Sequence, residues 1–182
     1  MDELTQNLYT NLGSTDDQVR MDAFTQLLSL TEKQVSWVYE VWDDLLERLD
    51  HPNSYQRSIA IKLLCNLVKS DAERKIDHSI GELLTHTKDE KFITSRQCIQ
   101  NIWKVALVSP DLKKQIIDHF ERRFRECIAE KHYNLLRTDI IQSIRNLYDY
   151  QSDAGLLKIG SSLIELEEEA KHRKKYEAIL SA

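Results

Sequence analysis

The chain has 182 residues, of which 30% are charged, and its formal net charge is −5. This length is enough for one domain with a sizeable core, and only 4 glycines and 2 prolines are too few for a turn-rich β-sandwich or a glycine-rich phosphate loop. The acidic balance disfavours nonspecific binding to nucleic acid or to anionic lipid. Composition therefore favours an all-α protein with charged outer faces.

Three cysteines, Cys65, Cys98 and Cys127, lack the paired spacing of a disulfide framework or a zinc site. No apolar run has the roughly 18 residues that a membrane span requires. The first ten residues lack the basic and apolar regions of a signal peptide. We therefore expect a cytoplasmic protein that uses no metal and no cofactor.

Helices are predicted in pairs along the chain. Four arginines are each followed by mostly apolar residues at offsets of 3, 7 and 10, which is the spacing of one helix face. The arginines are Arg20, Arg57, Arg96 and Arg137. Apolar residues four positions apart precede each arginine and predict a first helix, which a short turn separates from the second. The repeating unit is therefore a helical hairpin of about 40 residues.

We expect these hairpins at residues 1–30, 32–68, 71–107 and 110–148, within one domain spanning 1–182. A single long helix at 152–180 is expected to cap the last hairpin. Thr31 with Gln34, and Ser70 with Glu73, have the spacing of capping boxes. They predict where the first helices of the second and third hairpins begin.

The turn and second helix of HEAT repeats resemble four stretches of this chain: DDQVRMDAFTQLLSL, LDHPNSYQRSIAIKLLCNL, TKDEKFITSRQCIQNIW and EKHYNLLRTDIIQSIRNL. The resemblance covers about residues 1–147 and implies an armadillo-like, right-handed α-α superhelix of about four hairpins. It also implies a ladder of stacked Asp and Arg side chains. The ladder positions are Arg20, Asp50, Arg57, Asp89, Arg96 and Arg137. Because HEAT-like solenoids serve many partners, the resemblance specifies architecture far more than function.

In HEAT-like proteins the second helices line a concave binding surface, which here corresponds to offsets 1, 5 and 8 from each arginine. These positions carry three cations and no carboxylate, so we expect an acidic segment of another protein as the partner. The residues expected to bind it are Lys62, Gln97, Asn101, Lys104, Gln142 and Arg145. A solvated polar face with a chance excess of cations is the alternative.

Two aromatic residues, Trp37 and Tyr39, are candidates for an exposed partner anchor. They cannot both join the helix face that Trp42 shares with Val38 and Leu45, so at least one should be partly exposed. Packing of these rings against a neighbouring hairpin is the alternative.

The sequence feature most similar to a catalytic or metal-binding motif is a recurring Asp-His pair, Asp77–His78 and Asp118–His119. Both histidines precede their arginine by 18 residues, so the pair has the period of the fold. Neighbouring helical residues point about 100° apart, so Asp and His cannot form a hydrogen-bonded couple within the pair. With no catalytic motif elsewhere, no catalytic residue is predicted.

The alkylpurine DNA glycosylases are also HEAT-like, and the resemblance to them implies an alternative function. In that family a basic concave cleft holds a carboxylate and tryptophans. The concave positions inferred here contain neither, and the chain is acidic. A non-catalytic protein-binding scaffold is therefore the favoured hypothesis, with nucleic-acid binding, catalytic or not, as the alternative.

Overall fold

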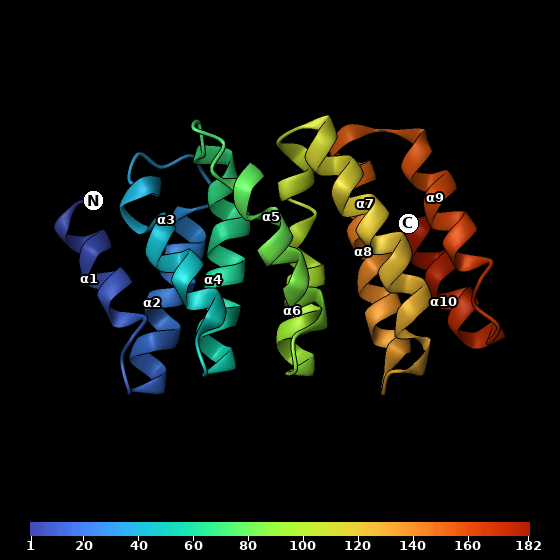
Figure 1. The fold of residues 1–182 in the computed structure, drawn as a ribbon, viewed down its shortest axis with the longest axis horizontal. Helices are drawn as coiled ribbons and strands as arrows, with labels where there is room; N and C mark the ends of the chain where they lie inside the picture. Colours follow the sequence, from blue (N-terminus) through green and yellow to red (C-terminus); the bar gives the residue numbers. More distant parts are fainter. The chain divides into compact units, whose positions relative to one another are not determined.

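The computed structural model describes all 182 residues and contains ten α-helices, short 3₁₀ turns and no strand (Figure 1). The helices are α1 (Glu3–Asn11), α2 (Asp17–Leu30), α3 (Val38–Glu47), α4 (Ser54–Leu67), α5 (Ile76–Thr85), α6 (Phe92–Ile102), α7 (Pro110–Glu126), α8 (Tyr133–Gln151), α9 (Ala154–Ile164) and α10 (Ala170–Leu180). They succeed one another as helical hairpins, so the predicted all-α solenoid class is confirmed. The chain comprises two compact units, Met1–Leu83 and Leu84–Ala182. That these units form one domain stays a prediction.

The first unit contains the hairpins α1–α2 and α3–α4 and most of α5. Asp2, Asp16 and Asn53 precede α1, α2 and α4, and each side chain accepts a hydrogen bond from a main-chain N–H two or three residues on, at 2.7, 2.9 and 2.9 Å. The apolar faces predicted for α2 and α4 are buried, apart from Leu30, which is 43% exposed. The start and the buried face of both second helices therefore follow from local sequence.

Helices α3 and α5 begin later than the sequence predicts, at Val38 and Ile76. The hydroxyl of Thr31 closes α2 by donating to the carbonyl of Leu27 at 2.8 Å. The hydroxyl of Ser70 accepts a hydrogen bond from the N–H of Val35 at 3.0 Å. The Thr31 hydroxyl binds the last turn of α2 and the Ser70 hydroxyl binds the turn before α3, so the prediction that they cap the next helices was wrong.

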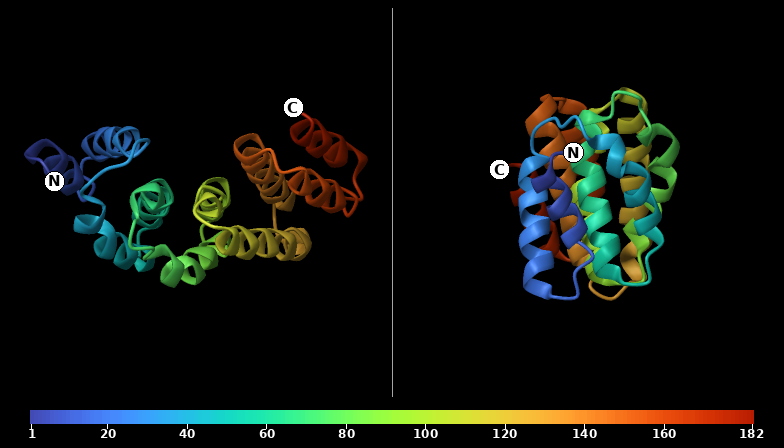
Figure 2. Two further views of the ribbon diagram at one scale, coloured as in Figure 1. Left: turned by 90° about the horizontal axis from the view of Figure 1, so that it is seen from above. Right: turned by 90° about the vertical axis from the view of Figure 1, so that its left-hand side faces the viewer.

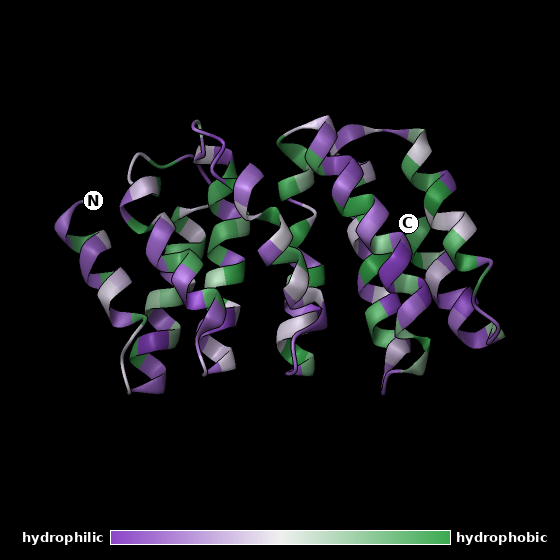
Figure 3. Cartoon of the chain, viewed as in Figure 1, coloured by the Kyte–Doolittle hydropathy of each residue, from purple (hydrophilic) through white to green (hydrophobic).

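The second unit contains α6 and the hairpins α7–α8 and α9–α10. Ser109 caps α7 with Pro110 as the first helical residue, as the pattern Ser-Pro-Asp indicates, and its hydroxyl accepts from the N–H of Leu112 at 3.2 Å. Hydrophobic and hydrophilic residues share each of these helices (Figure 3). The hydrophobic ones form a core in which several side chains are fully buried, among them Ile99, Phe120, Phe124, Ile140 and Ile144. Burial of these amphipathic faces is the main source of stability for such helices.

The predicted single helix at 152–180 is in fact two helices, α9 and α10, joined by a turn (Figures 1 and 2). The chain turns at Glu167, whose buried carboxylate accepts from Arg137 Nη1 at 2.9 Å and from the N–H of Glu169 at 3.1 Å. A Cβ on Gly160 of α9 would lie 2.7 Å from Leu180 Cδ1, so the glycine lets α9 and α10 cross closely. The helices form a fifth hairpin in place of a lone cap.

An arginine–carbonyl contact recurs in three of the hairpins and identifies α10 as a second helix. Arg20 donates to the carbonyl of Ser14 at 2.6 Å, and Arg57 donates to that of His51 at 2.8 Å. Arg173 of α10 donates through Nε to the carbonyl of Glu167 at 3.0 Å. Each carbonyl belongs to the residue six positions before the arginine, so the contact joins the turn to the first turns of the second helix.

Candidate functional site

Polar contacts fix α6 against α8 within the second unit. Arg96 donates to both carboxylate oxygens of the buried Asp139, from Nε to Oδ2 at 2.6 Å and from Nη2 to Oδ1 at 3.0 Å. Gln100 also donates to Asp139, at 2.9 Å, and Ser143 donates to the carbonyl of Ile99 at 2.8 Å. The hydrogen bond to Asp139 raises the pKa of Arg96. Since these bonds set the register of the two helices, equivalent positions on α6 and α8 form neighbouring rows.

The rows contain five of the six residues predicted to bind a partner. Gln97, Asn101 and Lys104 lie on α6 and the turn that follows it, while Gln142 and Arg145 lie on α8. All five are partly or fully exposed. The Asn101 amide donates to the carbonyl of Gln97 at 2.8 Å and accepts from Lys104 Nζ at 3.1 Å, while Gln97 Oε1 is buried without a hydrogen-bond partner. We call this set of five residues the amide surface.

The positive charge of Arg145 on the amide surface is offset by a neighbouring carboxylate. Its Nε donates to Asp149 at 2.8 Å, and its Nη1 donates to the carbonyl of Leu180 in α10 at 3.0 Å. The hydrogen bond to Asp149 raises the pKa of Arg145. Asp149 lies one turn beyond the positions considered in the sequence, so a carboxylate accompanies this cation.

An aromatic pair closes one end of the amide surface. The rings of Trp103 and Tyr150 lie 5.5 Å apart at 51°, and the Trp103 indole nitrogen lies 3.3 Å from the side-chain amide of Asn146. Tyr150 is 72% exposed. Trp103 stands at offset 7 from Arg96, on the helix face predicted to be apolar, but it is only half-buried. Tyr150 was missed because it lies beyond the offsets of the repeat.

The remaining predicted residues lie in the first unit. Lys62 of α4 has its ammonium nitrogen 5.6 Å from the centre of the Phe24 ring. Trp37 is half-buried at the start of α3. Tyr39 is also half-buried, and its hydroxyl accepts from the N–H of Glu73 at 2.6 Å and donates to Asp71 at 3.1 Å. The Tyr39 ring is therefore tied to the turn before α5.

The residues predicted to form a ladder make several kinds of contact. Arg20 and Arg57 bind turn carbonyls, and Arg96 binds Asp139, as described above. Arg137 donates to the carbonyl of Phe124 at 3.0 Å as well as to Glu167. Asp50 is exposed, and Asp89 accepts from the N–H of Lys91 at 2.8 Å.

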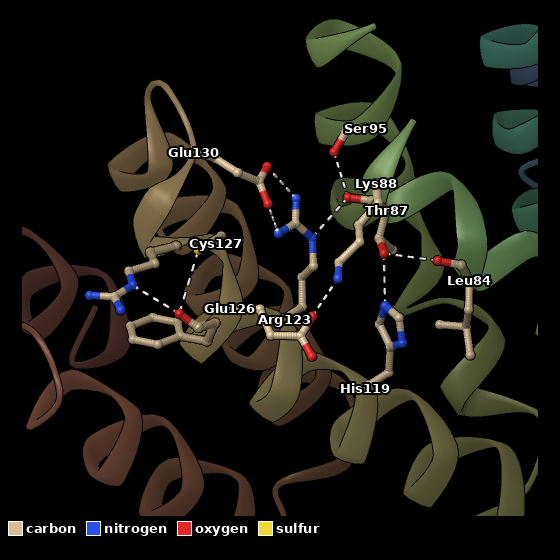
Figure 4. Close-up of polar contacts among 11 residues, drawn as sticks. Leu84, Thr87, Lys88, Ser95, His119, Arg123, Glu126, Cys127 and Glu130 are labelled. Atoms are coloured by element: carbon tan, nitrogen blue, oxygen red, sulfur yellow. Dashed lines mark hydrogen bonds and ion pairs between the residues drawn. The ribbon is translucent and has the colours of Figure 1, made fainter. Parts of the chain in front are cut away.

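A buried polar network joins the turn after α5 to α6, α7 and the turn before α8 (Figure 4). Arg123 of α7, only 1% exposed, donates to the carbonyl of Thr87 at 3.0 Å and binds Glu130 through two hydrogen bonds of 2.5 and 2.8 Å. Ser95 donates to the same carbonyl at 2.5 Å. These bonds satisfy a buried guanidinium, so the network stabilises the packing of successive hairpins.

His119 belongs to the same network. Its Nε2 lies 2.7 Å from the Thr87 hydroxyl, which itself donates to the carbonyl of Leu84 at 2.8 Å, so Nε2 carries a hydrogen and donates (Figure 4). Burial, together with the positive charges of Arg122 and Arg123, lowers the pKa of His119 to about 4. His78, in contrast, is exposed. The two Asp-His pairs thus occupy equivalent positions of the repeat, but only His119 takes part in a polar network.

No group of three or more His, Cys, Asp or Glu side chains is placed to hold a metal ion. Cys65, Cys98 and Cys127 are buried and form no disulfide, and burial raises the pKa of the Cys127 thiol. A thiol in such surroundings is a poor nucleophile. None of the ten helices is long and apolar enough to cross a membrane.

No protein-family model matches the chain, and no curated protein matches it in sequence. Among solved structures, it is similar to two engineered proteins from the Northeast Structural Genomics Consortium. They are 16% and 15% identical, with TM-scores of 0.54 and 0.50, and the matches cover 100% of this chain and 80% and 98% of theirs. A designed armadillo repeat protein in complex with the peptide (KR)4 is 12% identical, with a TM-score of 0.49, over 99% of both chains. At these identities the likeness concerns the fold alone, and membership of the HEAT family stays a prediction.

Proposed function

We propose that this protein is a non-catalytic repeat scaffold whose second unit binds an extended segment of another protein along the amide surface. The observation that carries the proposal is the presence of amide side chains on both neighbouring second helices. Gln97, Asn101 and Gln142 stand on α6 and α8, whose register is fixed by Asp139.

The chemistry of the amide surface suits main-chain recognition. An amide side chain both donates and accepts hydrogen bonds, as does each peptide unit of an extended segment. The Oε1 atom of Gln97 is a buried acceptor without a donor, which costs free energy of about 1–3 kcal/mol. A side-chain rotation that brought this oxygen to an N–H of the bound segment would remove that cost.

The ends of the amide surface suggest which side chains the segment carries. Lys104 places its ammonium group 3.1 Å from the Asn101 amide oxygen at this end of the surface, so an acidic side chain fits beside it. The exposed ring of Tyr150, held against Trp103, offers an anchor for an apolar or aromatic side chain. Because Asp149 accompanies Arg145, a strongly acidic partner is not required.

Site-specific crosslinking tests the proposal. A photo-reactive amino acid replaces Gln142 in one variant and the exposed Gln26 of α2, in the first unit, in a matched control. We expect ultraviolet light to join a partner polypeptide from a cell extract to the first variant and not to the control. Adding Asn101→Ala should weaken this capture about tenfold, since one amide position is lost from the centre of the surface. Equal capture at both positions would contradict the proposal.

Binding to DNA is the competing hypothesis, and the same protein can be titrated against a labelled duplex at several salt concentrations. Phosphate contacts would give affinity that falls steeply with salt. The pairing of Arg145 with Asp149 and the net charge of −5 lead us to expect no such binding.

A further inference from the structure

The fifth hairpin bears a groove between α9 and α10 with a volume of about 660 Å³. Leu157, Ile164 and Leu180 provide its apolar surface, and Glu165, Arg173 and Glu177 line it as well. This volume is within the range of about 300–1,000 Å³ that ligand-binding clefts span. The groove shares no residue with the amide surface, which it meets where Arg145 donates to the carbonyl of Leu180.

In the inner hairpins, the position four residues after the anchoring arginine meets the second helix of the next hairpin. Phe24 of α2 receives the ammonium group of Lys62 from α4, 5.6 Å from its ring centre. Gln100 of α6 donates to Asp139 of α8 at 2.9 Å. Ile141, the equivalent residue of α8, is fully buried. On this side α2, α6 and α8 are therefore covered by a further helix of their own unit.

Glu177 is the equivalent residue of α10, and it is exposed. The neighbouring residue Tyr176, about 100° around the helix, faces α8, where its hydroxyl donates to the carbonyl of Asn134 at 3.1 Å. The groove thus lies on the side of α10 that in α2, α6 and α8 is covered by another helix. The repeat geometry indicates an α-helix as the occupant.

Charge determines what kind of helix fits. Glu165 and Glu177 are exposed, and neither forms an ion pair within the chain. Arg173 is engaged, since its Nε and Nη2 both donate to the carbonyl of Glu167. Two unpaired carboxylates beside an apolar surface complement lysine or arginine residues flanking an apolar stripe. Lys62 over Phe24 shows that a cation on the covering helix can reach this position.

We propose that the groove between α9 and α10 binds a basic amphipathic α-helix of a partner protein, laid along α10 as α10 lies along α8. The apolar stripe of that helix packs on Leu157, Ile164 and Leu180, and its cations pair with Glu165 and Glu177. The proposal does not depend on the function assigned to the amide surface, since the two surfaces share no residue.

A fluorescent model peptide of about 18 residues tests the proposal on the full chain by anisotropy, since this length is enough for a partly formed helix. Its leucines repeat with helical spacing and lysines fill the flanking positions. We expect the double variant Glu165→Gln/Glu177→Gln to bind it about tenfold more weakly than the unchanged protein. The matched control Glu32→Gln/Glu47→Gln removes two exposed carboxylates from the first unit, and we expect no change in affinity. Equal losses in both variants would mean nonspecific attraction to an acidic protein and would overturn the proposal.

A charge-reversal variant distinguishes loss of the proposed ion pairs from loss of the fold as the cause of weaker binding. The variant Glu165→Lys/Glu177→Lys should lose the lysine peptide and bind a peptide with glutamates in place of the lysines. Methyl resonances of Leu157, Ile164 and Leu180 should shift on peptide binding to the unchanged protein, and shifts confined to other methyl groups would overturn the proposal. Self-association in sedimentation velocity that Glu165→Gln/Glu177→Gln abolishes would also overturn it, because a second copy would then be the occupant.

Discussion

Removing Glu130 should destabilise the second unit more than removing the buried arginine that it binds. Arg123 is 1% exposed, whereas the Glu130 side chain is 44% exposed. In Glu130→Ala the guanidinium loses its counter-ion in a place that water reaches poorly. Breaking a buried pair in this way costs about 3–5 kcal/mol, and we expect about 3 kcal/mol because water can enter where the carboxylate was.

Arg123→Met keeps most of the side-chain volume and removes the buried charge. Glu130 is then free to be hydrated, and the carbonyl of Thr87 still accepts the hydrogen bond from Ser95 at 2.5 Å. The remaining loss is that of charge-assisted hydrogen bonds, about 1–2 kcal/mol. Once Arg123 is gone, Glu130→Ala should add less than about 0.5 kcal/mol, so the two substitutions are strongly non-additive.

Urea unfolding followed by circular dichroism measures these free energies, provided that the denaturant slope is the same for all variants. The pair Glu121 and Arg125 on the same helix is a matched control, because its atoms are 3.9 Å apart and both side chains are partly exposed. Glu121→Ala should cost less than about 0.5 kcal/mol. If Arg123→Met proves as destabilising as Glu130→Ala, or if the two changes add, the argument from burial is wrong.

Three further predictions concern single residues. Because the pKa of His119 is lowered from 6.5 to about 4, the unfolded chain takes up a proton in this range that the folded chain does not. The free energy of unfolding should therefore fall as the pH decreases from about 6.5 to about 4, and His119→Gln should flatten this dependence in urea titrations at several pH values. Gly81 lies within α5, and a Cβ there meets nothing within 4 Å, so Gly81→Ala should raise the free energy of unfolding by about 0.5–1 kcal/mol in the same assay. Ser152 ends α8 in the left-handed region, with φ 52° and ψ 32°, which glycine adopts at less cost. Ser152→Gly should therefore raise the free energy of unfolding by about 0.5–1 kcal/mol and raise the melting temperature. An unchanged or lower melting temperature would contradict the strain inferred there.

The second helices could be predicted from sequence because their signals are local. An arginine in the first turns and apolar residues at offsets 3 and 7 lie within one stretch of chain, and a capping side chain precedes them in α2 and α4. Arg173 with Tyr176 and Leu180 continues this pattern, 36 residues after Arg137, and would have revealed the fifth hairpin. The glutamate-rich stretch before Arg173 hid it, because such residues are also typical of an exposed helix.

The environment of Glu167 could not be predicted from its neighbours. Its spacing from Lys171 suggests an exposed helical ion pair, but the structure buries it against Arg137, 30 residues earlier. Burial alone would raise the pKa of Glu167, but the hydrogen bond from Glu169 N–H and the pairing with Arg137 outweigh it and lower the pKa. The contact of Arg145 with the carbonyl of Leu180 was equally hidden, since it depends on where α10 ends. Its pairing with Asp149, four residues on, could be read from the sequence.

The arginine–carbonyl contact has a consequence for how the turn sequences of such repeats can evolve. In Arg20, Arg57 and Arg173 the guanidinium binds a main-chain carbonyl, which every residue type offers. Substitutions in the intervening turn therefore leave the contact intact, whereas inserting or deleting one residue displaces the carbonyl. The turn sequences STDDQ, HPNSY and EEEAK, which begin at the accepting residue and differ at every position, have the same length between the two ends of the contact. Turn composition is thus free to diversify in such hairpins, while turn length is held constant.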